Sequence, residues 1–215
     1  MKQIDFLLLA VCAFLFLSAS APYGKPWNQH VQSIPGRIEC EWYDLGGEGV
    51  AYHDSDSSNN GSGRLNPANG EELNEFRMKE GVDISFTKPK GIDDNAYNKV
   101  NPELNELYVG WTQPGEWINY TINVHEAGIY RVGTMYTANR DGTIGLRVDG
   151  KLVASHLKIN STYHEQDTVA WRQWHHWNKV DTLTEIKMTK GIHVLTLSIE
   201  EQGNMNFDYL EWKKR

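Results

Sequence analysis

The chain has 215 residues, with 21 Lys and Arg against 28 Asp and Glu and a net charge of −7. This acidic balance argues against a nucleic-acid partner, because nucleic acids are bound by basic surfaces. A hydrophobic fraction of 40% and a charged fraction of 23% are ordinary for a globular domain. They exclude a wholly disordered, collagenous or membrane-embedded chain.

Residues 1–21 have the pattern of a secretory signal peptide. Lys2 precedes an apolar run from Phe6 to Leu17, and small residues up to Ala21 suit cleavage there. The run is too short for a membrane span of roughly 20 residues, and no other stretch comes close. We therefore expect a secreted product, extracellular or periplasmic. With Cys12 removed, Cys40 is its single thiol, so no intramolecular disulfide can form.

Residues 22–33 are predicted to be an N-terminal leader. They contain Pro22, Gly24 and Pro26 and show no periodicity. We expect this segment to pack loosely or not at all, with the domain proper covering residues 34–215.

Period-two patterns from Ile34 onward predict strands. In 38–43, Ile38, Cys40 and Trp42 are expected to share one face, with Glu39, Glu41 and Tyr43 on the other. The same alternation occurs in 117–124, 129–136, 143–148 and 193–200, with Gly-containing turns at 141–142, 149–150 and 190–191. Many short strands of this kind predict an all-β sandwich or barrel.

Two long segments, 54–80 and 88–105, interrupt the strand pattern. The best helix candidate, 70–80, has too few apolar residues at helical spacing. Loops of this length in a compact domain are usually functional or disordered.

The segment from Trp171 to Trp177 holds three Trp and two His among seven residues. As a strand it would be aromatic on both faces, so its rings could not all enter one core. An exposed indole suits the apolar face of a sugar ring. The alternative is that all three Trp serve packing. Adjacent His175 and His176 would point apart, which disfavours joint metal ligation.

Carboxylates on the first and last predicted strands form a second group. Glu39 and Glu41 lie on one face of the first strand, and Asp208 lies on the last. If these strands pair, the three could surround Ca²⁺. The alternative is a solvated acidic face. A glycosidase acid–base pair is disfavoured, because residues two apart on one strand cannot flank a sugar from two sides.

Six blocks of the sequence, in order, resemble family 6 carbohydrate-binding modules: 34–44, 46–54, 80–84, 109–112 with 115–117 and Tyr120, 190–193, and 206–211. The similarity extends from Ile34 to Trp212. It implies a jelly-roll β-sandwich of two antiparallel sheets. It also implies binding of polysaccharide or oligosaccharide without cleavage, in association with glycoside hydrolases.

In this family two aromatic rings in loops at one end of the sandwich clamp a sugar, and an Asn bonds its hydroxyls. By motif the resemblance assigns these roles to Trp111, Trp174 and Asn206, with Trp171 as second choice to Trp174. It assigns a structural Ca²⁺ to Glu39, Glu41 and Asp208.

Segments 61–76 and 88–107 exceed the family's usual loops, and Cys40 replaces its usual Ala. Two other functions stay open. One is a small secreted glycoside hydrolase or lyase using loop carboxylates, among them Glu71, Glu72, Asp93 and Asp94. The other is an adhesion module that contacts protein through residues 22–33.

Overall fold

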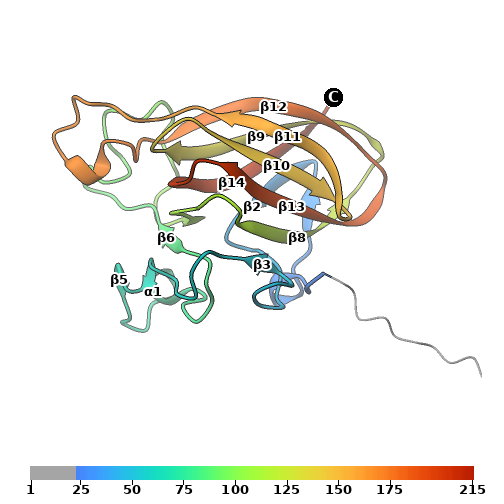
Figure 1. The fold of residues 1–215 in the computed structure, drawn as a ribbon, viewed down its shortest axis with the longest axis horizontal. Helices are drawn as coiled ribbons and strands as arrows, with labels where there is room; N and C mark the ends of the chain where they lie inside the picture. The colour runs from blue at the N-terminus through green and yellow to red at the C-terminus, as the bar shows by residue number, and fades with distance from the viewer. Residues whose placement is uncertain (1–22) are drawn as a thin grey trace, which may run out of the picture.

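The computed structural model describes residues 23–215. The predicted signal peptide, residues 1–21 with Cys12, lies outside the described residues. The fold is a sandwich of two β-sheets (Figure 1), which confirms the predicted all-β class. No helix among the described residues is long and apolar enough to cross a membrane.

The first sheet has six strands in the order β1-β8-β13-β10-β11, with β3 also paired to β8. Their bounds are β1 Gln32–Ile34, β3 Tyr52–His53, β8 Trp117–Val124, β10 Gly142–Val148, β11 Lys151–Ile159 and β13 Gly191–Glu201. All pairs are antiparallel except β1 with β8.

The second sheet has six strands in the order β12-β9-β14-β7-β6, with β2 also paired to β14. Their bounds are β2 Gly36–Glu39, β6 Ile84–Phe86, β7 Leu107–Val109, β9 Gly128–Ala138, β12 Asn178–Met188 and β14 Met205–Lys214. A small sheet joins β4 (Ser62–Gly63) to β5 (Asn66–Pro67). The helices are short: 3₁₀-helices η1 (Trp27–Gln29) and η2 (Ala170–Arg172), and α1 (Glu72–Glu75).

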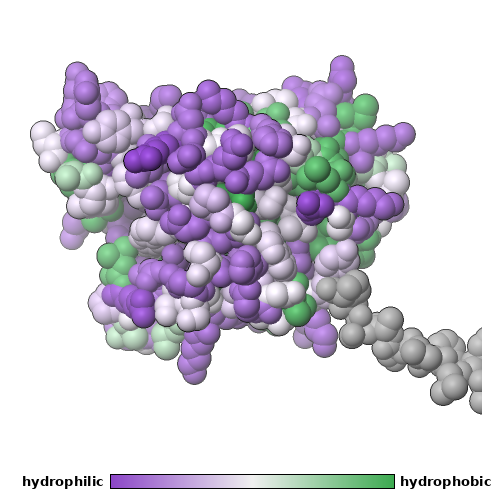
Figure 2. All heavy atoms as spheres, in the orientation of Figure 1, coloured by the Kyte–Doolittle hydropathy of each residue, from purple (hydrophilic) through white to green (hydrophobic). Residues whose placement is uncertain are grey.

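The core lies between the facing sheets. On β8 the apolar side chains that alternate in the sequence are all buried: Ile118, Tyr120, Ile122 and Val124. β14 places Phe207, Leu210 and Trp212 in the same core. The period of two therefore identified the buried face of β8 correctly. The face of the molecule in Figure 2 is mainly hydrophilic, with small separate hydrophobic areas, as expected for a water-exposed surface.

β2, the strand that carries Glu39, pairs with the last strand, β14, as the calcium hypothesis required. Ile38 of β2 lies opposite Leu210 of β14. The predicted faces beyond Glu39 were wrong, because β2 ends there and the Trp42 N–H bonds back to the Glu39 carbonyl at 3.3 Å. This turn breaks the alternation. Glu41 and Tyr43 are consequently buried, whereas Trp42 is half-buried.

Residues 23–33 pack against the domain, contrary to the expected loose leader. β1 pairs with β8, and Lys25 forms a two-way backbone bridge with Leu45. The Trp27 ring contacts Phe76 at 5.3 Å between centroids. The partial burial of the Trp27 ring contributes hydrophobic free energy that holds this segment on the domain. A single aromatic residue in a segment without periodicity did not predict this contact.

Removal of the Trp212 side chain is expected to destabilise the fold. This ring is 0% exposed, so Trp212→Ala leaves a cavity and lowers the free energy of unfolding by about 3–5 kcal/mol. Ile192, 60% exposed, provides the control, and Ile192→Ala should change stability by less than about 0.5 kcal/mol. Urea unfolding followed by fluorescence measures both, and equal losses would contradict this core assignment.

Candidate ligand-binding site

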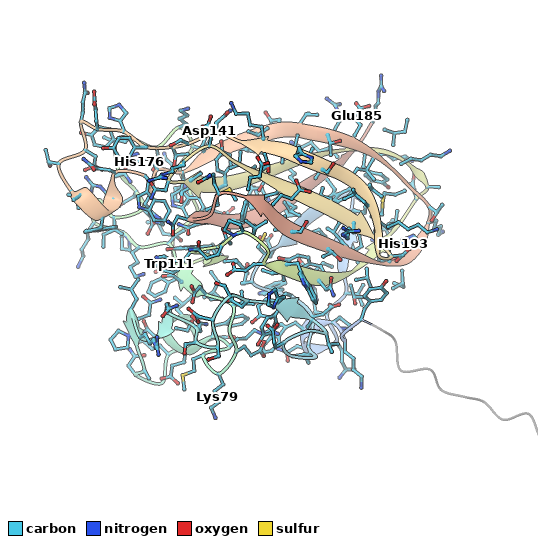
Figure 3. The ribbon with its side chains drawn as sticks, viewed as in Figure 1. Lys79, Trp111, Asp141, His176, Glu185 and His193 are labelled. Carbon is cyan, nitrogen blue, oxygen red and sulfur yellow. The ribbon has the colours of Figure 1, made fainter. Side chains whose placement is uncertain are left out.

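A pocket of about 540 Å³ opens among the loops at one end of the sandwich. Figure 3 shows Trp111 and His176 at this end, with His193 and Glu185 at the opposite end. The residues that line the pocket come from three loops and from β7 with the turn after it: Leu65, Lys88, Ile92, Asp93, Tyr108, Trp111, Trp171, Trp174 and His175. All three Trp predicted to contact ligand, Trp111, Trp174 and Trp171, are among them.

Trp111 follows β7 on a tightly held turn. Its backbone is left-handed, with φ 48°, a conformation that bulky residues rarely adopt. The Trp111 N–H donates to Oδ1 of Asn206 at 3.0 Å, and its carbonyl accepts from Gln113 Nε2 at 3.2 Å. These bonds stabilise the unusual backbone and leave the indole half-buried at the pocket wall.

The Trp171–Trp177 segment is not a strand. It contains η2, and local bonds from Arg172 N–H to Val169 and from His175 N–H to Arg172 form successive turns. The alternation expected of a strand therefore does not apply. Trp177 is fully buried, whereas Trp171 is 58% exposed and Trp174 is half-buried. The expectation that these rings do not all enter one core is confirmed.

Asn206 lies beneath the pocket instead of lining it. Its side chain is 1% exposed. Nδ2 donates to Thr137 Oγ1 and to His175 Nδ1, each at 2.9 Å, while Oδ1 accepts from the Trp111 N–H. Both amide N–H groups are thus used within the protein. As placed here, Asn206 orients Trp111 and His175, which the sequence motif did not indicate.

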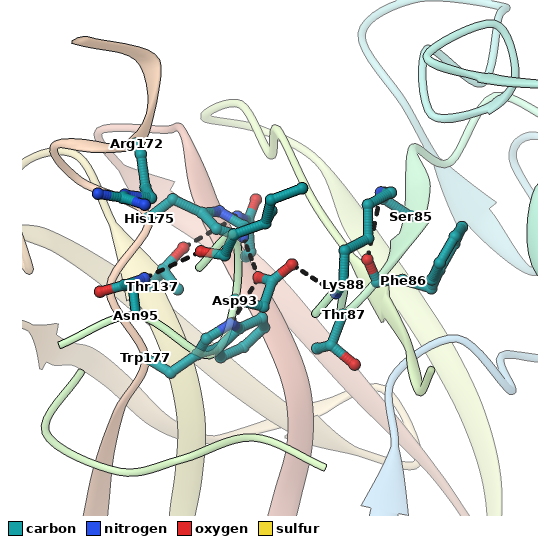
Figure 4. Close-up of polar contacts among 12 residues, drawn as sticks. Ser85, Phe86, Thr87, Lys88, Asp93, Asn95, Thr137, Arg172, His175 and Trp177 are labelled. Carbon is teal, nitrogen blue, oxygen red and sulfur yellow. Dashed lines mark hydrogen bonds and ion pairs between the residues drawn. The ribbon is translucent and has the colours of Figure 1, made fainter. Parts of the chain in front are cut away.

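His175 continues this network to Asp93 (Figure 4). Because Nδ1 accepts from Asn206, the ring proton is on Nε2, which donates to Asp93 Oδ1 at 2.6 Å. Oδ1 also accepts from Trp177 Nε1 at 2.8 Å, and Oδ2 accepts from the Lys88 N–H at 2.7 Å. Burial opposes ionisation of Asp93, but these donors outweigh it and hold its pKa below the ordinary value.

A second buried carboxylate, Asp167, fixes the Trp-containing loop. Its oxygens accept from Arg172 Nε at 2.7 Å and Nη2 at 2.8 Å, and from His176 Nε2 at 2.9 Å. Arg172 Nη1 also donates to the Gly91 carbonyl, and Tyr97 donates to Gln166. These contacts join the long 88–105 segment to the Trp-containing loop. His175 and His176 therefore serve different carboxylates.

Several lining residues were missed from the sequence: Leu65, Lys88, Ile92, Tyr108 and His175. The available signal was loop length, because Leu65 and the 88–93 residues come from the two unusually long segments. Of the four loop carboxylates considered for catalysis, only Asp93 reaches the pocket, where it is the one carboxylate of the lining. Glu71, Glu72 and Asp94 are exposed elsewhere.

Glu39, Glu41 and Asp208 lie at the paired terminal strands, away from the pocket. The Cys40 N–H donates to the Asp208 carbonyl at 2.9 Å, which holds the two strands together here. Burial raises the pKa of Glu39 and of Asp208 to about 7, with the Glu39 charge adding to the effect on Asp208. Burial also raises the pKa of Glu41, whose buried Oε2 has no hydrogen-bond partner among the described residues.

These three carboxylates offer the oxygen donors that Ca²⁺ prefers. A bound cation would also offset the burial of their charges and give Glu41 Oε2 a partner. Over residues 23–215, however, no three or more His, Cys, Asp or Glu side chains are placed so that they could hold a metal ion together. The donor chemistry fits calcium, and the calcium assignment stays a prediction.

The fold and this loop-end aromatic pocket define a carbohydrate-binding module. A family model described as carbohydrate binding module (family 6) matches residues 83–214, more than half of the chain. The chain belongs to this family.

Two solved structures illustrate the similarity. CsCBM6-3 from Clostridium stercorarium in complex with cellobiose is 16% identical, with a TM-score of 0.51 over 86% of this chain and 98% of that one. A family 43 arabinoxylan arabinofuranohydrolase from Bacillus subtilis in complex with cellotetraose is 18% identical, also with a TM-score of 0.51 over 86% of this chain. This chain covers 28% of that hydrolase. A comparison with curated proteins finds no significant sequence match.

The Asp167 network predicts a pH-dependent stability. Arg172 holds the pKa of Asp167 well below its usual range, so this stabilisation is present above about pH 4, the unfolded pKa, and is lost as pH falls below it. Asp167→Asn should therefore lower the free energy of unfolding by about 2 kcal/mol at pH 7, and the difference from wild type should shrink at pH 3.

Urea unfolding at pH 7, 5 and 3 measures this difference. Asp181→Asn is the matched control, because the Asp181 carboxylate is 78% exposed and its pairs with Lys179 and Lys213 are on the surface. If the difference in free energy of unfolding between wild type and Asp167→Asn stays constant down to pH 3, the ionised Asp167 carboxylate is not its source.

Proposed function

We propose that this protein is a secreted, non-catalytic module that binds polysaccharide or oligosaccharide chains by stacking sugar rings on Trp111 and Trp174. Trp171, more exposed at the pocket rim, extends the aromatic surface to a neighbouring sugar. Export is supported by the signal-like sequence of residues 1–21. Association with glycoside hydrolases is supported by the resemblance of the chain to part of a family 43 hydrolase.

One observation carries the proposal: half-buried indoles from two separate loops line the same pocket. The C–H groups on one face of a pyranose ring are attracted to the negative face of an indole, and a rigid ring loses little entropy on binding. Asn206 holds both loops from below, so the rings need little rearrangement to bind. We infer that Asn206 serves the site through this positioning.

The chemistry of the lining supports binding without cleavage. Glycoside hydrolysis ordinarily needs two carboxyl groups, one on each side of the scissile bond. Asp93 supplies the one carboxylate of the pocket lining, and both of its oxygens already accept hydrogen bonds from the protein. Absence of reducing-sugar release from a polysaccharide panel tests this part of the proposal.

We also propose a structural Ca²⁺ held by Glu39, Glu41 and Asp208. Support comes from the like charges of Glu39 and Asp208, which act on Glu41, and from the unpartnered Oε2 of Glu41. The cation would neutralise buried like charges and fasten β2 to β14. Since none of these residues lines the aromatic pocket, calcium is expected to affect stability more than affinity.

Loss of either stacking ring should remove most of the affinity. Trp111→Ala and Trp174→Ala are each expected to weaken glycan binding by about 30-fold or more, equivalent to about 2 kcal/mol. Trp171→Ala should cost less than about tenfold, because its ring is 58% exposed. Affinity electrophoresis against a polysaccharide panel, followed by calorimetry on the best ligand, measures these losses.

The control for the ring substitutions is Tyr163→Ala, which removes an aromatic ring that is 51% exposed but outside the pocket. Thermal unfolding confirms that each variant is folded. Unchanged affinity in folded Trp111→Ala or Trp174→Ala would refute the stacking assignment.

Calcium should stabilise the protein against heat. Saturating Ca²⁺ is expected to raise Tm above the value in chelator by several degrees, at about 2–4 °C for each kcal/mol of binding free energy. Asp208→Asn should abolish this response, and Asp141→Asn, an exposed carboxylate elsewhere, should retain it. Identical melting curves with and without calcium would remove the metal proposal.

A further inference from the structure

The polar side chains under the pocket leave few hydrogen-bonding groups for a ligand. The amide N–H groups of Asn206 are used by Thr137 and His175, and both ring nitrogens of His175 are engaged. Asp93 directs its oxygens at His175, Trp177 and the Lys88 N–H. A ligand that reaches the pocket floor therefore meets groups whose hydrogen bonds are already made.

Lys88 differs from these residues. Lys88 lines the pocket wall, and its ammonium donates to Ser85 Oγ at 3.1 Å and to the Phe86 carbonyl at 3.3 Å. An ammonium has three N–H donors, so these two bonds leave one without an acceptor among the described residues. The Phe86 ring centroid lies 4.2 Å from Nζ and adds a cation–π contact.

No carboxylate of the described part of the chain lies within ion-pair distance of Lys88. Lys88 is also the one Lys or Arg in the pocket lining. Arg172 lies outside the lining and pairs with Asp167. The Asp93 carboxylate acts on Lys88 through its charge, but its oxygens accept hydrogen bonds from His175, Trp177 and the Lys88 backbone N–H and form no ion pair with Nζ. The wall thus holds a positive charge that is partly desolvated and has no direct counter-ion.

A half-buried ammonium of this kind is best satisfied by an anion. The ammonium donates a charge-assisted hydrogen bond to any acceptor, but an anionic acceptor adds the Coulomb attraction between opposite charges. The lining residues Leu65, Ile92 and Tyr108 strengthen this attraction by excluding water. A neutral hydroxyl would accept a hydrogen bond from Nζ but would leave the charge uncompensated.

We propose that the pocket selects acidic glycans, in which a sugar stacked on Trp111 or Trp174 places a carboxylate or sulfate ester against Lys88. This inference rests on the proposed function, since it names the ligand class of the same site. Carboxylate and sulfate ester share the negative charge that Lys88 recognises, and the experiment separates them.

The test compares ligands that differ only in charge. Carboxylated probes are polygalacturonate and alginate, each against its carboxyl-reduced or methyl-esterified form. The sulfated probe is carrageenan against its desulfated form. We expect wild-type protein to bind at least one charged form about 10- to 100-fold more tightly than its neutral partner. A preference among the carboxylated probes identifies a carboxylate as the recognised group, and a preference for the sulfated probe identifies a sulfate ester.

Substitution of Lys88 connects the preference to this side chain. Lys88→Met keeps most of the stem and removes the charge, so it should lower the affinity for the charged ligand to about that for its neutral form. Lys88→Arg should retain part of the preference. Lys90→Met is the matched control, because Lys90 is exposed on the same loop and lies outside the lining.

The outcomes separate the two levels of the proposal. Equal affinity for charged and neutral forms, or a preference that persists in folded Lys88→Met, overturns the acidic-glycan inference while stacking by Trp111 and Trp174 stands. No binding to any glycan, charged or neutral, overturns the proposed function and this inference together. If Lys88→Met does not fold, the ligand pairs on wild type and Lys88→Arg still decide the question.

Discussion

The buried amide of Asn206 joins the two loops that carry the aromatic rings. Its oxygen fixes the left-handed backbone of Trp111, and its nitrogen donates to His175, the neighbour of Trp174. Asn206 itself is held by β14, the strand that also pairs with β2 and β9. The spacing of the rings is therefore set by the sheet and not by the loops alone.

The same network explains how loop segments can form a well-ordered pocket. Buried polar groups stabilise a structure when every member is satisfied, and the chain of bonds from Asn206 through His175 to Asp93 meets this condition. The indoles stay open because polar side chains, not further apolar packing, support them from below. None of Glu39, Glu41 and Asp208 lines the pocket that this network supports.

Much of the fold follows from local sequence patterns. Alternation in β8 identified its buried face, and the Trp-rich segment indicated rings that could not all be buried together. The resemblance of six blocks to family 6 modules indicated Trp111 and Trp174, which do line one pocket. The alternation misled beyond Glu39 and at 171–177, because turns there replace the strand and the period of two no longer applies.

By itself, then, the sequence determined the strand pattern, the sandwich class and the aromatic residues available to a ligand, since each of these depends on neighbours along the chain. Only the tertiary structure decided that the amide of Asn206 makes its hydrogen bonds within the protein and that Lys88 and Leu65 line the pocket. Those placements depend on contacts between residues far apart in sequence, such as Asp93 with His175, which no local pattern encodes.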